Sequence, residues 1–252
     1  MKFIDTNLWI GNWPFAPLSR NEVKEVSRRL SRFDIDTAFV STFECVFQVD
    51  PMPGNRSLRK TVARRRRLRA LPVLNPGVAA WRDHLDELAD WPETKAIRLL
   101  PGYHGYRLDS RSTRACVEAL QSRGIRVLAT ARLIDERHEH RAVTVKPPAL
   151  GQWEGFLEFA SSANPLIQGL SVHELRALSE FGRRFSADIS FAEWEDTLRV
   201  LKGFMSTTRI MFGSLSPLQV LQAQIDKIRL SSLALNQREK VANLNAVKYF
   251  GV

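Results

Sequence analysis

The sequence predicts an α/β fold in which eight parallel strands, each followed by a helix, close into a single (β/α)8 TIM barrel. A short apolar strand followed by an amphipathic helix recurs eight times along the chain. The length of 252 residues matches the usual size of one such barrel, about 250 residues. An open, doubly wound sheet is the competing architecture, but it usually has fewer strands and often a glycine-rich first turn, which this chain lacks.

The eight predicted strands are short and mostly non-alternating apolar runs, which are typical of strands covered on both faces. Their ranges are 2–5, 37–41, 69–74, 96–100, 126–131, 166–170, 187–189 and 209–213. Residues 234–250 add an extra C-terminal helix, which we expect to pack across the barrel.

Four capping boxes, each a serine followed three residues later by Glu or Gln, predict where helices begin. They pair Ser19 with Glu22, Ser171 with Glu174, Ser190 with Glu193, and Ser216 with Gln219, the last with Pro217 at the first helical position. Val23, Val26 and Leu30 recur at helical spacing and give one helix an apolar face. Gly124 predicts the end of the helix before the fifth strand.

The composition predicts one domain over residues 1–252, because 44% hydrophobic and 25% charged residues suit a chain with a sizeable core. The first residues lack the unbroken apolar region of a signal peptide, and no stretch reaches the roughly 20 apolar residues of a membrane span. We therefore expect a cytoplasmic location and no membrane partner. Cys45 and Cys116 have neither disulfide-framework nor zinc-type spacing, so we expect two reduced thiols.

The formal net charge of +10 is locally extreme between residues 56 and 69, in a cluster made up of Arg59, Lys60, Arg64, Arg65, Arg66 and Arg67. Such a run can bind nucleic acid or another polyanion. It also suits a solvated helix face, because Leu58 and Val62 lie four residues apart and can hold the segment against a barrel. We favour the solvated face and do not expect nucleic acid as a partner, because no recognised nucleic-acid motif accompanies the charge.

Several motifs follow one another along nearly the whole chain. The first reads DTNLWIG from Asp5 to Gly11, followed by Trp13-Pro14-Phe15. Further segments are IRLLP at 97–101, YHGYRL at 103–108, LIDER at 133–137, FGSLSP at 212–217 and NAVKYF at 245–250. Together these segments resemble the amidohydrolase superfamily, specifically its amidohydrolase-related metal-dependent hydrolases, whose first strand reads D-x-H-x-H-x-G. The resemblance implies a TIM barrel that hydrolyses amide, ester or lactone-like bonds, or decarboxylates aromatic acids, with a metal-activated water.

Three positions depart from the metal ligands that the resemblance implies. Asn7 and Trp9 stand where the first strand would present histidines, and Leu215 stands where the last strand would present an aspartate. A zinc-type ion needs nitrogen, thiolate or carboxylate donors, and neither an indole nor an isobutyl group can donate. We therefore predict a degenerate metal site, with no metal ligand and no cofactor.

The predicted site lies at the carboxyl ends of the strands and in the loops that follow them. Its catalytic candidates are Asp5, His104 and His173. Its substrate-binding candidates are Asn7, Trp9, Trp13, Arg98, Tyr103, Arg132, Glu174 and Ser214. Arg98 and Arg132 present planar donors that suit a carboxylate or phosphate, but Asp5 or Glu174 could instead hold either arginine in an ion pair. We expect a small anionic, partly aromatic ligand or substrate.

The remaining histidines and cysteines have simpler alternatives. His104 also suits a loop position between aromatic residues, and His173 also suits an ordinary helix start. His138 and His140 form an H-x-H string, but the arginines on both sides would oppose a cation, so we do not expect a metal there. Cys45 lacks an evident histidine partner for covalent catalysis.

Three functions therefore compete. The first is an amidohydrolase-like hydrolase or decarboxylase with a rebuilt, metal-independent site. The second is a non-catalytic barrel that binds or senses a small molecule, and the third is a polyanion binder that uses the cluster at residues 64–67. The resemblance favours the first, but a fold alone does not decide among them. The sequence is compatible with a homo-oligomer and does not name the substrate.

Overall fold

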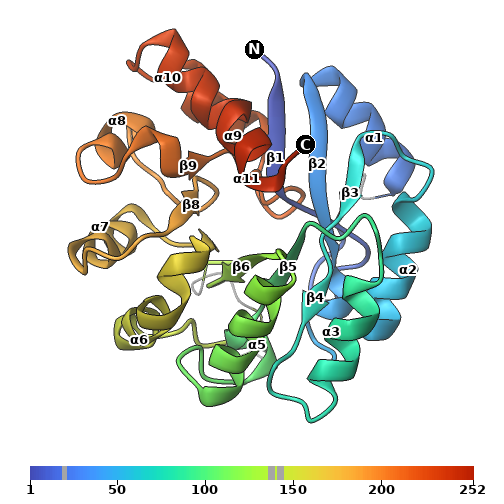
Figure 1. The fold of residues 1–252 in the computed structure, drawn as a ribbon. Helices are drawn as coiled ribbons and strands as arrows, with labels where there is room; N and C mark the ends of the chain where they lie inside the picture. Colours follow the sequence, from blue (N-terminus) through green and yellow to red (C-terminus); the bar gives the residue numbers. More distant parts are fainter. Residues whose placement is uncertain (19–21, 136–139, 141–144) are drawn as a thin grey trace.

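The computed structural model describes residues 1–18, 22–135, 140 and 145–252. Ser19 of the first capping box and His138 of the H-x-H string lie outside the described residues. Figure 1 shows the strands gathered near the centre and the helices arranged around them. None of the helices in the described ranges combines the length and the apolar run needed to span a bilayer.

All strand pairs of the described chain are parallel, and they form two sheets. The strands are β1 Phe3–Ile10, β2 Ile35–Thr42, β3 Leu68–Ala70, β4 Val73–Leu74, β5 Ala96–Leu99, β6 Arg126–Thr130, β7 Leu166–Gln168, β8 Ser186–Asp188 and β9 Ile210–Met211. One sheet has the order β1-β2-β3 and the other the order β4-β5-β6-β7-β8-β9. Each of the eight predicted segments overlaps an observed strand, and the segment 69–74 overlaps both β3 and β4.

Backbone hydrogen bonds bridge the two sheets where β3 gives way to β4. The amide of Leu71 donates to the carbonyl of Val40 in β2, and the carbonyl of Pro72 accepts from the amide of Arg98 in β5, both at 2.8 Å. A proline has no amide hydrogen to donate, which interrupts the regular ladder at this point. The chain between β3 and β4 therefore contacts one sheet on each side.

A second set of backbone hydrogen bonds links β1 to the chain that follows β9. The amide of Thr6 donates to the carbonyl of Phe212 at 3.0 Å, and the amide of Leu215 donates to the carbonyl of Asn7 at 2.8 Å. The first and last strand segments therefore lie side by side, although they are some 200 residues apart in sequence.

Strand β1 continues five residues beyond its predicted end at residue 5, and all eight of its residues are buried. The polar part of the first motif therefore lies inside a strand rather than in a loop. The pairing of β1 with β2 is irregular between Asp5 and Leu8, so strict alternation of side chains does not apply there. Hydrogen bonds instead place Asn7 against both Asp5 and Trp9.

The helices follow the strands in alternation, as predicted. They are α1 Val23–Arg32, α2 Met52–Val62, α3 Trp81–Ala89, α4 Pro101–His104, α5 Arg111–Ser122, α6 Leu150–Ala160, α7 Val172–Glu180, α8 Thr197–Lys202, α9 Leu221–Arg229, α10 Leu235–Glu239 and α11 Asn245–Phe250. Short 3₁₀ turns lie at Phe43–Cys45, Ser161–Ala163 and Thr207–Arg209. Val26 and Leu30 of α1 are buried, as their spacing predicts.

Two predicted helix boundaries are confirmed. Ser171 and Glu174 form a complete capping box at the start of α7, because each side chain accepts from the other residue's amide. Gly124 follows the end of α5 with φ of 69°, a left-handed conformation that glycine adopts without strain.

Two other capping boxes are wrong. The hydroxyl of Ser190 donates to Asp188 instead of capping a helix, and α8 begins later, with Asp196 as its cap. Ser216 is held by β1, because its carbonyl accepts from the amide of Trp9, and α9 begins only at Leu221. In both places the serine bonds to a residue of a strand instead of capping a helix. The spacing of Ser and Glu or Gln does not reveal this contact.

Residues 235–250 form α10, a π-helical turn over Lys240–Leu244 and α11 in direct succession. Ala246, Tyr249 and Phe250 pack on apolar side chains from the strands, including Ile4 and Phe39. The rings of Phe39 and Phe250 stack with centroids 3.8 Å apart. This last helix therefore covers the interior near the amino ends of the strands, and the carboxyl ends remain for a site.

We expect Phe250→Ala to lower the free energy of unfolding by about 3–5 kcal/mol, because it removes a buried aromatic ring and leaves a cavity. Urea denaturation of the variant measures this loss. Leu244→Ala, at an exposed position in the same helical stretch, serves as the control and should change stability by less than about 0.5 kcal/mol. Equal effects of the two changes would contradict the packing role of Phe250.

Candidate functional site

A buried polar network lies at the carboxyl ends of the strands, and Asp5 is its first member. Both carboxylate oxygens are occupied: Oδ1 accepts from the amides of Asn7 at 3.0 Å and Ser214 at 2.9 Å, and Oδ2 accepts from the hydroxyl of Ser214 at 2.5 Å. These bonds join β1 to the chain after β9. Two predicted site residues, Asp5 and Ser214, are thereby in direct contact.

Asn7 connects Asp5's strand to Asp188 at the end of β8. Its amide nitrogen donates to Asp188 Oδ2 at 2.9 Å and to the hydroxyl of Ser190 at 3.3 Å, while its oxygen accepts from Trp9 Nε1 at 2.9 Å. The hydroxyl of Ser190 in turn donates to Asp188 Oδ1 at 2.8 Å. All four side chains are buried, so the network is closed from solvent.

Arg98 of β5 lies beside this network with no exposed surface. None of its three guanidinium nitrogens has a hydrogen-bond partner among the described residues. The guanidinium lies 4.3 Å from the ring centroid of Trp9, in cation–π contact. Burial lowers the pKa of Arg98 to about 9, opposed by the negative charges of Asp188 and Asp5. The structure therefore holds a buried cation whose donors are all available.

Burial also acts on the two carboxyl groups. It raises the pKa of Asp5 from its usual value near 3.8 to about 6, although the hydrogen bonds from Ser214 and Asn7 favour the charged form. The pKa of Asp188 is raised for the same reason, against the bonds from Ser190 and Asn7. Desolvation is the larger effect in both groups because neither has water to stabilise its charge.

These residues do not fit the divalent metal that the resemblance implies. The carboxylate oxygens of Asp5 and Asp188 already accept hydrogen bonds, and the side-chain amide of Asn7 donates to Asp188. Trp9 and Leu215 offer no donor, and the described residues contain no group of three His, Cys, Asp or Glu able to hold a metal ion. The fixed cation beside the carboxylates is instead the guanidinium of Arg98.

Three predicted site residues gather elsewhere on the same end of the strands. Arg132 forms a bidentate ion pair with Glu174, both distances 2.7 Å, and these two residues line a cavity of about 520 Å³ together with His173. Burial opposes the ion pair, but Arg132 and Ser171 still lower the pKa of Glu174. The structure therefore contains the alternative ion pair that the sequence left open, with Glu174 bound to Arg132.

The other aromatic candidates form an apolar cap over the strand ends. Trp9, Trp13 and Phe43 pack together, with Tyr103 at the edge of the cluster. The ring of Trp9 stacks on Phe43 with centroids 5.3 Å apart. Trp9 and Trp13 are therefore buried in a cluster of side chains rather than lining an open pocket.

His104 and Cys45 contact each other through the backbone. Nε2 of His104 donates to the carbonyl of Cys45 at 2.9 Å, and burial lowers the pKa of the histidine. The thiol of Cys45 is buried and donates to the carbonyl of Pro51, and burial raises its pKa strongly. A neutral histidine held on a carbonyl and a protonated thiol do not form a nucleophile–base pair.

Asp188, Ser190 and Gln168 belong to the network, yet the sequence analysis does not name them as site residues. Asp188 lies inside a predicted strand, where a carboxylate is conspicuous among apolar neighbours. A second signal is Gly213: a Cβ at that position would lie 2.3 Å from Asp188 Oδ2, so only glycine leaves room for the carboxylate. Gln168 adds a donor to the carbonyl of Thr6 at 2.9 Å and links β7 to β1.

Comparison with solved structures finds the same fold over the whole chain. The chain is similar to 5-carboxyvanillate decarboxylase from Sphingomonas paucimobilis, with a TM-score of 0.79, 14% identity, and coverage of 100% of this chain and 99% of that one. It is also similar to a dihydroxybenzoic acid decarboxylase from Polaromonas, solved with manganese and the inhibitor 2-nitroresorcinol, with a TM-score of 0.75, 15% identity, and coverage of 99% and 97%. A proposed amidohydrolase from Staphylococcus aureus matches with a TM-score of 0.73, 11% identity and complete coverage of both chains.

No protein-family model matches the chain, and no curated protein matches it in sequence. At these identities the solved structures establish a shared fold. The resemblance to amidohydrolase-related proteins that the motifs indicate is therefore confirmed at the level of the fold.

The raised pKa of Asp5 predicts a pH-dependent stability. The folded protein holds this proton more tightly than the unfolded chain, so the contribution is fully present below about pH 3.8 and is lost as the pH rises through about 6. Between about pH 4.5 and pH 7.5, this group should lower the free energy of unfolding by about 2 kcal/mol. Asp5→Asn should remove this component, as measured by urea denaturation at both pH values.

Asp83→Asn, at an exposed position in α3, is the matched control and should keep the pH dependence of the original protein. An identical pH dependence in the Asp5→Asn variant would show that the carboxyl of Asp5 is not the group that titrates.

The side chains of the candidate site also predict how much metal the purified protein contains. Protein purified without chelators should contain no stoichiometric manganese or zinc, and EDTA should leave its Tm unchanged, because the residues described at the strand ends provide no ligand shell. Elemental analysis measures this directly. About one metal ion per chain, lost on Asp188→Ala, would contradict the prediction.

Proposed function

We propose that this protein is a metal-independent barrel that binds a small anionic molecule, and that Arg98 contacts the anionic group. The observation that carries the proposal is a fully buried guanidinium without a hydrogen-bond partner among the described residues. Unpaired buried charges are costly, and native proteins rarely retain them without a use. A carboxylate is the group that a guanidinium fork fits best, through two parallel hydrogen bonds.

The nearby carboxylates do not satisfy this requirement. Asp5 and Asp188 act on Arg98 through their charges, but their oxygens bond to serine and asparagine instead. They stabilise the cation in the absence of ligand without occupying its donors. A ligand carboxylate would therefore gain charge-assisted hydrogen bonds, worth roughly 1.5–3 kcal/mol each before the costs of association.

The proposal requires the aromatic cap to move when a ligand enters, because Trp9 covers the guanidinium and is itself fully buried. Indole and phenyl rings that open around an aromatic acid would also stack against it. The solved decarboxylases of the same fold, with 2-nitroresorcinol in one and 4-hydroxy-3-methoxy-5-nitrobenzoic acid in another, support an aromatic anion as the ligand class.

We further infer that the two sheets form the wall of one eightfold barrel. The hydrogen bonds at Leu71 and Pro72, and those between β1 and the chain after β9, support this inference at the two seams. In such a barrel the carboxyl ends of all strands surround a single mouth. Arg98, Asp5 and Asp188 would then face one another across it.

A hydrolase or decarboxylase activity is the second candidate, and the pKa of Asp5 favours it. A buried carboxyl with a pKa of about 6 can accept or donate a proton near neutral pH. His104 is held on a backbone carbonyl and His173 is exposed on α7, so neither contacts Asp5. Acid–base chemistry in this site would depend on Asp5, with Arg98 as the group that orients the substrate.

The test compares aromatic acids with their amides. Benzoate should raise the Tm of the original protein more than benzamide does, because only the acid carries the charge that Arg98 binds. Arg98→Met should weaken benzoate binding about tenfold or more and leave benzamide unaffected. Without ligand, this variant should lose little stability, because Asp5 and Asp188 keep their hydrogen bonds to serine and asparagine and take up protons more readily once the cation is gone.

Arg114→Met is the matched control, since Arg114 also lies over an aromatic ring, that of Phe159, but at the surface. It should leave acid binding unchanged. Equal stabilisation by acid and amide would refute the anion site. A large loss of stability in the Arg98→Met variant without ligand would instead identify Arg98 as a structural charge for Asp5 and Asp188.

A further inference from the structure

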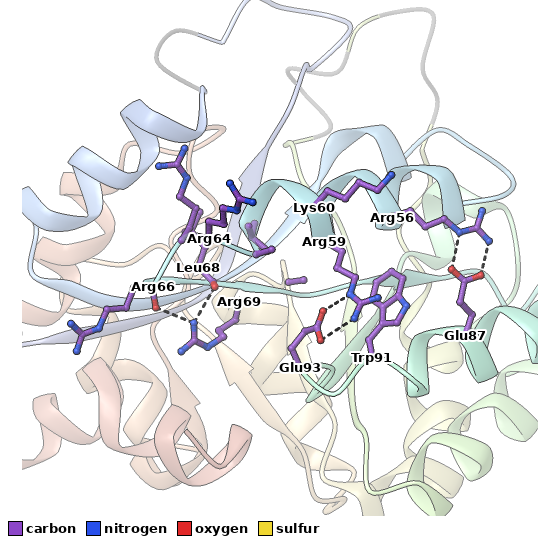
Figure 2. A pocket seen from close by; sticks show the side chains of 14 residues that line it. Arg56, Arg59, Lys60, Arg64, Arg66, Leu68, Arg69, Glu87, Trp91 and Glu93 are labelled. Carbon is purple, nitrogen blue, oxygen red and sulfur yellow. Dashed lines mark hydrogen bonds and ion pairs between the residues drawn. The ribbon is translucent and has the colours of Figure 1, made fainter.

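A basic groove of about 1070 Å³ (Figure 2) is lined by α2, β3 and neighbouring loops, and it lies at the end of the strands opposite the candidate site. It is formed by α2, the turn that leads into β3, and the chain that follows α3. Because this turn precedes β3, it lies at the amino ends of the parallel strands. Its cationic lining consists of Arg56, Arg59, Lys60, Arg64, Arg65, Arg66 and Arg69.

The two acidic side chains of the basic groove are already paired. Glu87 binds Arg56 through both oxygens, and Glu93 binds Arg59 in the same way. Lys60 and the arginines at residues 64–66 have no carboxylate partner among the residues that the structure describes. A concave surface with a single sign of charge concentrates its electrostatic potential and attracts polyanions.

The geometry differs from the solvated helix face that the sequence favours. Leu58 and Val62 are buried as predicted, but α2 ends at Val62. Residues 64–67 therefore lie in the turn, where Arg69 donates to the carbonyls of Arg66 and Leu68. Figure 2 shows Arg64 and Arg66 extending away from the glutamate pairs of Arg56 and Arg59. The arginines at residues 64–66 thus lie in the turn that follows α2 instead of on a helix face.

We propose that the basic groove binds the sugar-phosphate backbone of a nucleic acid without regard to base sequence. Arginine forks suit phosphate oxygens, and several cations in succession can each neutralise one phosphate. Trp91 offers no platform for a base, because it is buried and Arg59 covers its ring at 4.7 Å. The contacts therefore favour the backbone over the bases.

A membrane surface fits the groove less well. Anionic bilayers bind basic segments that are accompanied by exposed apolar side chains. The large hydrophobic side chains that are exposed in the described part of the chain do not include any residue of the basic groove. The surface is also concave, which suits a chain that lies within it better than a flat layer of headgroups.

Fluorescence anisotropy with a labelled single-stranded DNA of about 20 nucleotides and mixed sequence tests the proposal. If the groove contacts about four phosphates, raising the salt concentration from about 50 mM to 200 mM should weaken DNA binding by about 50-fold. Arg65→Ala combined with Arg66→Ala should weaken binding about tenfold at the lower salt concentration and make the salt dependence shallower, because two phosphate contacts are lost.

Arg183→Ala combined with Arg184→Ala is the matched control, because it removes the same charge from an exposed pair on another loop. It should change binding by less than about twofold. An equal loss in both double variants would show that only net charge acts. Absence of salt-dependent binding, or tighter binding of poly-glutamate or of vesicles with phosphatidylserine than of the DNA, would overturn the proposal.

Discussion

The buried cation of Arg98 is the constraint on which the site depends. A guanidinium enclosed by protein pays a large desolvation cost, and at this position the cost is offset by two buried carboxylates and the face of an indole. The carboxylates in turn are kept in place by serine and asparagine donors. Each group thus compensates the charge or satisfies the hydrogen bonds of its neighbour, which explains why the interior at this end of the strands is polar although it is dry.

The same arrangement includes the three residues that depart from the metal-ligand pattern implied by the resemblance. Asn7 donates to one carboxylate and accepts from Trp9, so it connects the two as a neutral group. The ring of Trp9 contacts the guanidinium of Arg98. Leu215 belongs to the same apolar cluster as Trp9. The three residues therefore lie in one buried region, and two of them link the carboxylate network to the arginine.

The sequence predicts the order and nature of the elements well, because apolar strands between amphipathic helices are encoded locally. It also assigns Asp5, Asn7 and Ser214 to one site, because all three lie at or just after the ends of predicted strands. It fails where contacts are set by distant residues. Ser190 and Ser216 have the spacing of helix caps, yet their groups bond to Asp188 and Trp9, and the pairing of Glu174 with Arg132 rather than Arg98 depends on which strand each residue follows.

The two ends of the strands handle positive charge in opposite ways, and this difference separates their roles. Arg98 is a single cation in a dry interior, where the proposed interaction with a small anion would be specific and little affected by salt. The cations of the basic groove are many and hydrated, so their attraction is collective, weakly selective and lost as ionic strength rises. The C-terminal helix fills the interior between the two ends with apolar side chains such as Phe250. The two proposed anion sites are therefore separated by an apolar layer, and each is tested with a ligand of its own.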